Sequence, residues 1–406
     1  MKRFFTCMIV IIILISCLTS CLYPVIKMVS HEVKNQENMP DSFSVHFPLL
    51  IDDMNYFKIP CTINDDTPIQ LIVDTKATSL MKEEDIIKHK ANYFGKLPFS
   101  MENAYKEKSS IKLYQFDKCS IQGLSIGNSL FKQISKNNLI HDFIGNGIIG
   151  SNLLQLGYWK FDIDAQKVTL FSKKDTEMIA SEIKGYTLIP HGIDYDRIQL
   201  SLPKLPDTQD FTLDLGFNGE IQIDNKLAKS LMKVIPFKTI ETEEFDQVKI
   251  MKHLFEKQTI VWNGIKIPNC QLINITAIDG NYIGAEFMQR FNFILAYGGR
   301  VRHKKQDHLY IQQVQGFDSI QTEPYISKFG FQFEQTNGIT QIYAIEQGGI
   351  AQKQGLKLGD EIIAIDNGNF DITNSKQFIS YSDAKESVIV KTKNRIYTLT
   401  AADEID

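Results

Sequence analysis

The chain has 406 residues, 43% apolar and 23% charged, with a formal net charge of −4 at neutral pH. The length predicts two or three domains, and the composition is that of a globular protein with a full core. The charge excludes the basic face of a nucleic-acid-binding protein, so no nucleic-acid partner is expected. Because the eight histidines are scattered and the cysteines lack metal-ligand spacing, we expect no metal and no cofactor.

The N-terminus has the pattern of a secretory leader. Basic residues in MKRFF precede the apolar run CMIVIIILISCL, and the motif LTSC ends at Cys21. A basic start before a short apolar run is typical of a signal peptide, and LTSC resembles a bacterial lipobox, in which Cys21 is lipidated. The motif ending at Cys17 fits the same pattern, and an uncleaved membrane anchor is the alternative, because apolar residues continue to Ile26. Either reading of residues 1–21 predicts a membrane-tethered protein of the bacterial cell envelope, facing the periplasm.

The chain that follows is predicted to be mainly β. Residues 22–42 are expected to form a tether, because 28–42 are polar and lack periodicity. Short alternating or apolar runs then predict strands at 57–63, 69–73, 110–116 and 119–127, and a hairpin over 160–171. Helical patterns are few: residues 83–90, residues 226–234 and a short piece after Gly150.

An internal repeat organises these elements. Residues 47–77 are echoed by residues 186–217, and both segments end in an apolar run that leads into an aspartate, Asp74 or Asp214. A second matching pair follows, in which Gly150 lies 76 residues after the first aspartate and Gly284 lies 70 residues after the second. Near-equal spacing in two copies predicts two similar lobes that contribute one aspartate each.

Two aspartates at equivalent strand ends have a defined chemistry. Facing carboxylates cannot both ionise comfortably, so they share one proton. The ionised member then acts as a base towards water, while the protonated member acts as an acid towards a carbonyl oxygen. Such a pair hydrolyses peptide bonds without a metal, provided that glycine lets the two backbones approach closely.

With these features the sequence resembles the retroviral-type (retropepsin-like) aspartic protease family in a bacterial two-lobe form. The motifs are the run Leu71 to Ala77 with the apolar-apolar-Gly element at Gly150, and the run Thr212 to Gly216 with the matching element at Gly284. The resemblance implies two acid-protease β-barrel lobes, residues 43–175 and 183–313, a peptide or protein substrate, and a flap within residues 91–118. It implies that the catalytic residues are Asp74 and Asp214, and that the supporting residues are Thr75, Lys76, Ala77, Leu215, Gly216, Gly150 and Gly284.

Each copy departs from the family pattern at one position. Lys76 stands where the family has a glycine, so it adds bulk and a positive charge beside the carboxylates. Leu215 stands where the family has a threonine whose hydroxyl braces the two lobes. Three functions therefore stay open: an aspartic endopeptidase, a catalytically inactive relative that binds peptides or envelope proteins, and a scaffold within an envelope complex.

Residues 318–401 resemble a PDZ domain. The segment Gly355 to Asp360, followed by the strand-like run Glu361 to Ile365, matches the turn-then-strand signature of that family. Phe329, Gly330 and Phe331 stand where the family has its carboxylate-binding loop, and backbone amides in such a loop can hold a peptide C-terminus. The resemblance implies a C-terminal peptide ligand, and a packing module without a ligand is the alternative.

Overall fold

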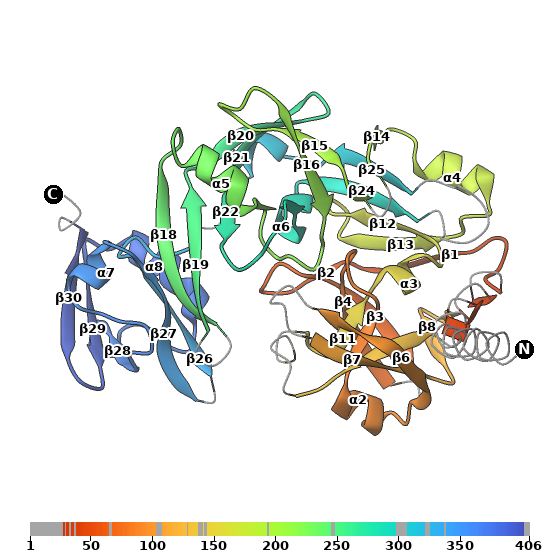
Figure 1. Ribbon diagram of the computed structural model, residues 1–406, viewed down its shortest axis with the longest axis horizontal. Coiled ribbons are helices and arrows are strands. Elements are labelled where there is room, and N and C mark those ends of the chain that lie inside the picture. Colours follow the sequence, from red (N-terminus) through yellow and green to blue (C-terminus); the bar gives the residue numbers. More distant parts are fainter. Residues whose placement is uncertain are drawn as a thin grey trace, which may run out of the picture.

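A computed structural model shows a mainly β protein with several sheets and a few short helices (Figure 1). The structure describes residues 27–401 except 29, 32–33, 36–37, 65–66, 103–107, 128, 137–140, 142–143, 193–194, 245–247, 298–306, 321–324 and 337. The predicted leader, including Cys21, lies outside the described residues. Within the described part of the chain, no helix has the length and apolar character needed to cross a membrane.

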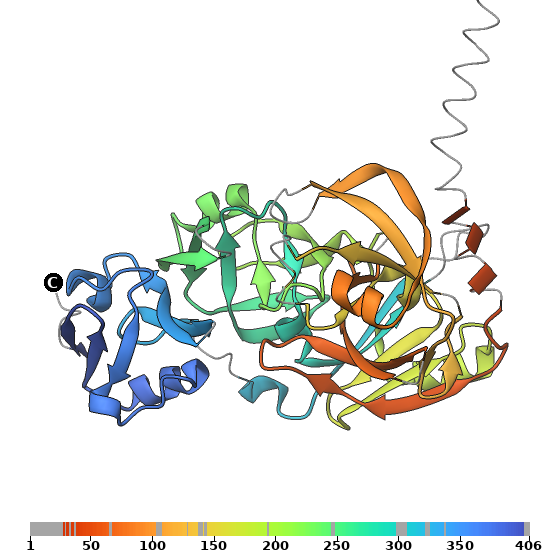
Figure 2. The same ribbon diagram turned by 90° about the horizontal axis from the view of Figure 1, so that it is seen from below.

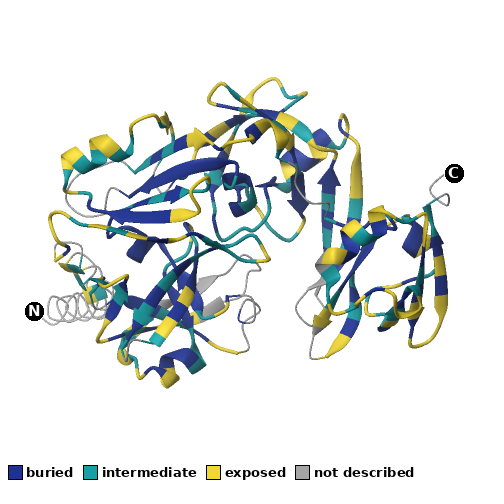
Figure 3. Ribbon diagram, turned by 180° about the vertical axis from the view of Figure 1, so that it is seen from behind, coloured by how far each residue is buried: buried dark blue, intermediate teal, exposed yellow. Residues whose placement is uncertain are grey.

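A six-stranded sheet contains strands from both copies of the repeat and so joins them. The pairing of β12 with β24, from Tyr158 opposite Ala296 to Phe161 opposite Phe293, places one copy directly against the other. Two of its inner strands, β13 and β24, are almost entirely buried (Figure 3). In spatial order the strands are β1 (Ser44–Pro48), β13 (Lys167–Phe171), β12 (Tyr158–Asp162), β24 (Phe291–Ala296), β25 (His308–Gln313) and β14 (Thr187–Ile189).

Two further sheets carry the rest of the repeat. The N-terminal sheet runs in the order β6 (Asn92–Glu102), β7 (Lys108–Gln115), β10 (Leu130–Ile134), β5 (Leu80–Lys82), β11 (Gly147–Ile149), β4 (Thr67–Val73), β3 (Phe57–Ile63), β8 (Cys119–Ile121) and β9 (Leu124–Ser125), with β2 (Leu50–Ile51) beside β3. The central sheet runs in the order β18 (Phe237–Glu244), β19 (Val248–Phe255), β22 (Leu272–Ile275), β17 (Ile221–Gln222), β23 (Tyr282–Ile283), β16 (Thr208–Leu213), β15 (Ile198–Ser201), β20 (Gln258–Trp262) and β21 (Ile265–Cys270).

The two orders are the same, element for element. Strand β4 therefore corresponds to β16, β11 to β23, and the hairpin β6–β7 to the hairpin β18–β19. Both strands that lead to an aspartate pair in parallel with the strand that carries the apolar-apolar-Gly motif. The hairpin β6–β7 occupies the region expected to contain a flap, and it projects from the first copy (Figure 2).

The helices are short, and two of them have a side-chain cap from an acidic residue. Acidic side chains accept hydrogen bonds from the first turns of α4 and α5, Asp175 from the Met178 amide and Asp224 from the Leu227 amide, which stabilises these ends. The helices are α2 (Glu83–Lys88), α3 (Ser151–Leu154), α4 (Thr176–Glu182), α5 (Asn225–Leu231), α6 (Ala285–Met288), α7 (Ile350–Lys353) and α8 (Ser375–Asp383), with 3-10 turns at Phe317–Ser319 and Asp366–Gly368.

The C-terminal residues form a unit with its own apolar core, beside the central sheet and away from the first copy (Figure 1). We call residues 325–401 the C-terminal unit. Its strands are β26 (Phe331–Thr336), β27 (Ile339–Glu346), β28 (Ile362–Ile365), β29 (Ser387–Thr392) and β30 (Ile396–Thr400). Strands β26 and β27 extend the central sheet, because β27 pairs with β18.

Part of the segment expected to be a tether contacts the first copy of the repeat. Met39 is buried in the main core, and Lys174 donates through Nζ to the Met39 carbonyl oxygen at 2.9 Å. The Ser172 hydroxyl donates to the Asp41 carbonyl oxygen at 2.7 Å. The burial of Met39 and the hydrogen bonds to Met39 and Asp41 fix this segment against the first copy, although most of the surrounding residues are polar.

Candidate active site

Asp74 and Asp214 lie at equivalent positions in the two copies of the repeat. Each follows a buried strand, and the backbone amide of each donates to a carbonyl of the parallel neighbour: Asp74 to Ile149 at 3.1 Å and Asp214 to Ile283 at 2.9 Å. Both carboxyl groups therefore emerge where a strand of one copy ends. Both residues are intermediate in exposure, neither fully buried nor open to solvent.

The turn that carries Asp214 lies directly against Asp74. An added Cβ at Gly216 would stand 2.3 Å from Asp74 Oδ2, closer than any real contact. The glycine kept in the second copy is thus the position at which the two backbones approach. The structure brings the two predicted catalytic residues together from strands 140 residues apart.

Burial and mutual repulsion set the protonation of this pair. Burial, and after it the charge of Asp74, raise the pKa of Asp214 to about 8, against the opposing effects of the Gly216 amide and the positive charge of Lys76. Burial also raises the pKa of Asp74, but the Ala77 and Lys76 amides and the Lys76 charge oppose that rise. Asp74 Oδ1 accepts both amides, at 2.8 Å from Ala77 and 2.7 Å from Lys76. The pair therefore favours one shared proton, held by Asp214 while Asp74 is ionised.

Thr75 connects the two copies next to the carboxyl groups. Its hydroxyl donates to the Leu213 carbonyl oxygen at 2.8 Å and accepts from the Leu215 amide at 3.2 Å. The Tyr297 hydroxyl donates to the Thr75 carbonyl oxygen at 3.5 Å. Leu215 itself is fully buried in the main core, so this bridge runs from one hydroxyl where the family pattern would supply two.

Replacing Thr75 with Val is expected to lower the free energy of unfolding by about 2–6 kcal/mol. The methyl group fits the same volume, but the Leu213 carbonyl and the Leu215 amide lose their buried partner, and each such loss costs about 1–3 kcal/mol. Urea unfolding measures the difference. Thr212→Val, on the strand before Asp214, is the control and should change stability little, and equal stability of the two variants would contradict the bridge.

Lys76 takes part in the site through its backbone, while its side chain is exposed to solvent. Its amide is one of the donors to Asp74, the contribution expected of the glycine that it replaces. Its ammonium group lowers the pKa of both Asp74 and Asp214, because a nearby positive charge favours the ionised carboxylate. The substitution thus preserves the backbone geometry and adds a charge.

Replacing Lys76 with Met is expected to raise the pKa of both aspartates, because the positive charge that lowers them is removed, and the effect should be modest because an exposed charge is screened by solvent. The titration of ¹³C-labelled carboxyl groups measures this directly, and the difference should shrink at high salt. Lys88→Met, which removes an exposed lysine from α2, is the control. A downward or absent shift in the first variant would contradict an electrostatic role.

The glycines of the second motif are required by close backbone packing. An added Cβ at Gly150 would stand 2.4 Å from the Ala77 carbonyl oxygen, and one at Gly284 would stand 2.0 Å from the Gly219 carbonyl oxygen. The Ser151 amide donates to the Ala77 carbonyl oxygen at 2.8 Å, which ties the aspartate turn to α3. These glycines therefore support the turns that hold the carboxyl groups.

The second copy contains a buried ion pair that sequence reasoning missed. Glu220 and Arg290 are both fully buried, and Glu220 Oε1 accepts from Arg290 Nε at 2.7 Å and from the terminal guanidinium nitrogen at 2.6 Å. The Gly284 amide donates to the Glu220 carbonyl oxygen, so the pair supports the turn after Asp214. An arginine within the apolar run FMQRFNF was the available signal, since a buried arginine requires a partner.

The first copy has an uncharged network in the corresponding place. Asn152 Oδ1 accepts from the Ser79 amide at 2.7 Å, and the Gly150 amide donates to Ser79 Oγ at 2.9 Å. Asn152 also donates to the Leu130 carbonyl oxygen at 3.0 Å. The two turns are thus held by different chemistry.

The predicted loop of the C-terminal unit precedes an open strand edge. Phe329 and Phe331 are fully buried, and Gly330 has a left-handed backbone with φ of 78°, which favours glycine. The Glu346 amide donates to the Gly330 carbonyl oxygen at 2.8 Å. Lys328 donates through Nζ to the Asp383 carbonyl oxygen at 3.1 Å, next to the end of α8.

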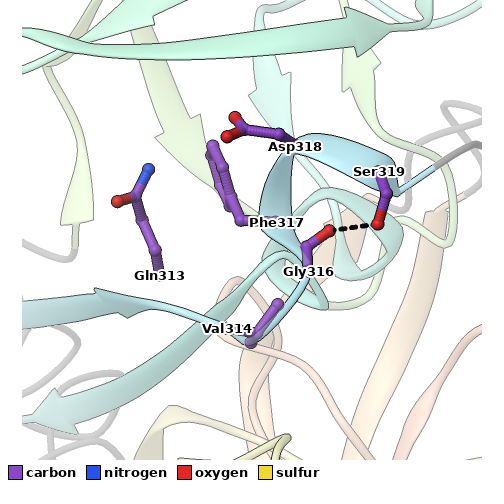
Figure 4. A pocket seen from close by; sticks show the side chains of 6 residues that line it. All are labelled: Gln313, Val314, Gly316, Phe317, Asp318 and Ser319. Atoms are coloured by element: carbon purple, nitrogen blue, oxygen red, sulfur yellow. Dashed lines mark hydrogen bonds between the residues drawn. The ribbon is translucent and has the colours of Figure 1, made fainter.

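The hollow in Figure 4 is not part of this site. It measures about 530 Å³ and lies where the chain leaves β25, lined by Gln313, Val314, Gly316, Phe317, Asp318 and Ser319. Its side chains include no aspartate of the pair. Across the described ranges, no group of three or more histidine, cysteine or acidic residues is arranged to hold a metal ion.

No protein-family model and no curated protein matches the chain. Among solved structures, a retropepsin-like aspartic protease from Rickettsia conorii is similar to this chain, with 17% sequence identity and a TM-score of 0.23. The match covers 32% of this chain and 93% of that protein. A TM-score this low carries no argument about function, and the geometry of the two aspartates is the basis for the proposal that follows.

Proposed function

We propose that this protein is an aspartic endopeptidase of the two-lobed retropepsin-like type, anchored in the cell envelope and carrying a C-terminal PDZ domain. The observation that supports it is the meeting of Asp74 and Asp214 at equivalent strand ends, with opposed influences on their pKa values. The carboxyl pair then has one proton and one negative charge near neutral pH, the state that peptide hydrolysis by two aspartates requires.

In this proposal each carboxyl group has its own role. Asp74 takes a proton from a water molecule, whose oxygen attacks the peptide carbonyl carbon, while Asp214 gives its proton to the carbonyl oxygen. The tetrahedral product collapses when the amide nitrogen receives a proton from Asp74, the C–N bond breaks, and Asp214 recovers its proton from the hydroxyl group. The products are a new carboxyl end and a new amino end, and the pair returns to its starting state.

Incubation of the folded protein, from residue 28 onward, with a proteome-derived peptide library tests the proposal. Mass spectrometry should find new peptide ends between about pH 5 and pH 8, with the alkaline limit set by loss of the Asp214 proton. An active-site inhibitor of aspartic peptidases should remove these products. Intact peptides at every pH, with folding verified by circular dichroism, would reject an endopeptidase.

A non-catalytic peptide-binding protein is the second candidate, and the charge of Lys76 beside the pair favours it. A positive charge stabilises two ionised carboxylates and so works against proton sharing. Under this alternative, peptides bind without being cut, and Lys76→Gly restores cleavage. Absence of cleavage in that variant too would leave a scaffold as the function of the fold.

We also assign a ligand to the C-terminal unit: a peptide with a free C-terminal carboxylate, held at the loop that contains Phe329, Gly330 and Phe331. Within this loop the Gly330 amide donates to the Ser327 carbonyl oxygen at 2.9 Å and the Phe331 amide donates to the Ser327 hydroxyl group at 3.4 Å, so the carboxylate replaces Ser327 as their acceptor. The left-handed Gly330 and the nearby ammonium group of Lys328 support this assignment. Binding of free-acid peptides but not of their amidated forms, measured by fluorescence anisotropy, is the expected result. Equal binding of the two forms would contradict a carboxylate site.

A further inference from the structure

The C-terminal unit is joined to the second hairpin by strand pairing. Ile240, Glu241 and Thr242 of β18 pair with Glu346, Ile345 and Ala344 of β27. The corresponding outer edge in the first copy is that of β6, and no strand in the described ranges pairs with it. The two hairpins are thus equivalent in topology and different in their partners.

Polar side chains and backbone groups add further contacts between the hairpin β18–β19 and the C-terminal unit. Lys238 Nζ lies 3.0 Å from Glu346 Oε2, and the Gln347 amide donates to the Thr239 carbonyl oxygen at 2.8 Å. Lys252 contacts the hydroxyl group of Tyr325 and lies over its ring. The contacts come from both strands of the hairpin, so the C-terminal unit holds the hairpin as a whole.

An apolar cluster connects the junction to the turn of Asp214. Ile326 and Ala344 of the C-terminal unit pack in one cluster with five residues of the central sheet, namely Ile240, Ile250, Leu254, Ile273 and Ile275. Phe217 packs against the same cluster, and its amide donates to the Asp214 carbonyl oxygen at 3.1 Å. A shift of the cluster therefore reaches the aspartate turn through one side chain.

The strand β26 forms the outer edge of the sheet that the C-terminal unit extends. Among the described residues, β26 pairs only with β27, and the loop with Lys328 and Gly330 immediately precedes it. A strand added to this edge would extend a hydrogen-bonded sheet that continues through β27 to the hairpin β18–β19. The negative charge of a terminal carboxylate complements the ammonium group of Lys328.

We propose that a peptide with a free C-terminus, bound as a strand on β26, controls the position of the hairpin β18–β19 and thereby peptide binding at Asp74 and Asp214. The ligand chemistry rests on the proposed function. The coupling rests on the strand pairing and on the cluster that contains Ile326 and Ala344. Since coupling between two sites is reciprocal, a ligand at the aspartates changes affinity at β26 by the same factor.

Hydrogen–deuterium exchange of the full chain tests this coupling without requiring cleavage. The probe is a pool of peptides of about ten residues with apolar C-terminal residues, supplied as free acids and as amides. The free acids should slow exchange in β26 and change it about fivefold or more in residues 237–255, with little change in β6–β7. Slowed exchange in β26 with an unchanged β18–β19 hairpin would overturn the proposal, as would the absence of any effect on β26.

Variants at the junction separate coupling from ligand binding. Ile326 is only 7% exposed and lies at the start of the C-terminal unit, before its first strand, so Ile326→Asp should separate the unit from the hairpin and abolish the response at 237–255. Ile326→Val is its matched control and should retain the response. A full response in a folded Ile326→Asp protein would overturn the proposal.

A charge exchange provides a second test that leaves the cores intact. Lys238→Glu places two negative charges together and should weaken the hairpin response, and adding Glu346→Lys should restore it. Lys249→Glu breaks another pair of the same hairpin, with Glu241, and should leave the response unchanged. Loss of the response in all three proteins would show that the charge pair does not transmit it, which contradicts the proposal. A coupled protein that cuts no peptide would reject only the proposed catalysis.

Discussion

Asp74→Asn and Asp214→Asn should each abolish peptide cleavage, with a loss of about a thousandfold or more in kcat, while leaving the fold intact. Asparagine has the shape of aspartate but neither takes nor gives the shared proton, and residues that act as a unit fail as a unit. Mass-spectrometric detection of peptide ends measures the loss. Asp210→Asn, on the strand before Asp214, is a control that should cleave normally. Residual cleavage in either active-site variant near the parent level would contradict the assignment.

Relative to the parent protein, the same two variants should become more stable as the pH rises. A variant that merely folds poorly would not show this pH dependence. An aspartate whose pKa is raised in the folded state binds its proton more tightly there than in the unfolded chain. It therefore stabilises the fold less as the pH rises from about 4, the unfolded value, towards about 8, its folded value. Asp214→Asn removes this loss, so its advantage over the parent in urea unfolding should grow steadily across that interval and level off above about pH 8. A constant difference across the interval would contradict a raised pKa.

The positions of the two aspartates were accessible from the sequence because local patterns define them. An apolar run that ends in aspartate predicts a strand end, and two copies with similar spacing to Gly150 and Gly284 predict equivalent places in two similar halves. The short helix after Gly150 and the hairpin over 160–171 follow from equally local signals. The mainly β character is confirmed for the same reason.

The contacts that complete the site were not accessible, because they join distant residues through long-range packing. The hydroxyl of Thr75 contacts a carbonyl 138 residues away, and no sequence period indicates which partner it takes. Pairing of β18 with β27 depends on two open strand edges, whose backbone groups are alike in every strand. Leu215 illustrates the same limit. The sequence shows that this position has no hydroxyl group, but only the fold shows that its side chain is fully buried in the main core.

Replacing Arg290 with Met should lower the free energy of unfolding by about 3–5 kcal/mol, the typical cost of leaving one member of a buried ion pair alone. Glu220 would lose its charged partner, and the carbonyl groups of Pro268 and Asn269 would lose donors at 3.1 Å each. Because burial already raises the pKa of Glu220 against the pull of Arg290, the variant should raise it further. The defect should therefore be smaller at about pH 3, where Glu220 is protonated in the folded and in the unfolded chain, than at about pH 8.

The double variant Glu220→Gln with Arg290→Met decides whether charge or packing carries this effect. Removing both charges should recover part of the lost stability, since a neutral pair incurs no penalty for a buried lone carboxylate. Asn152→Ala is the matched change in the uncharged network of the first copy, and it should cost about 1–3 kcal/mol with no dependence on pH. If Arg290→Met costs as little as that, or costs the same at every pH, the ion pair does not support the Asp214 turn. If the predicted contrast is observed, the two halves of a single site are held by different forces: an ion pair beside the Asp214 turn and neutral hydrogen bonds beside the Asp74 turn.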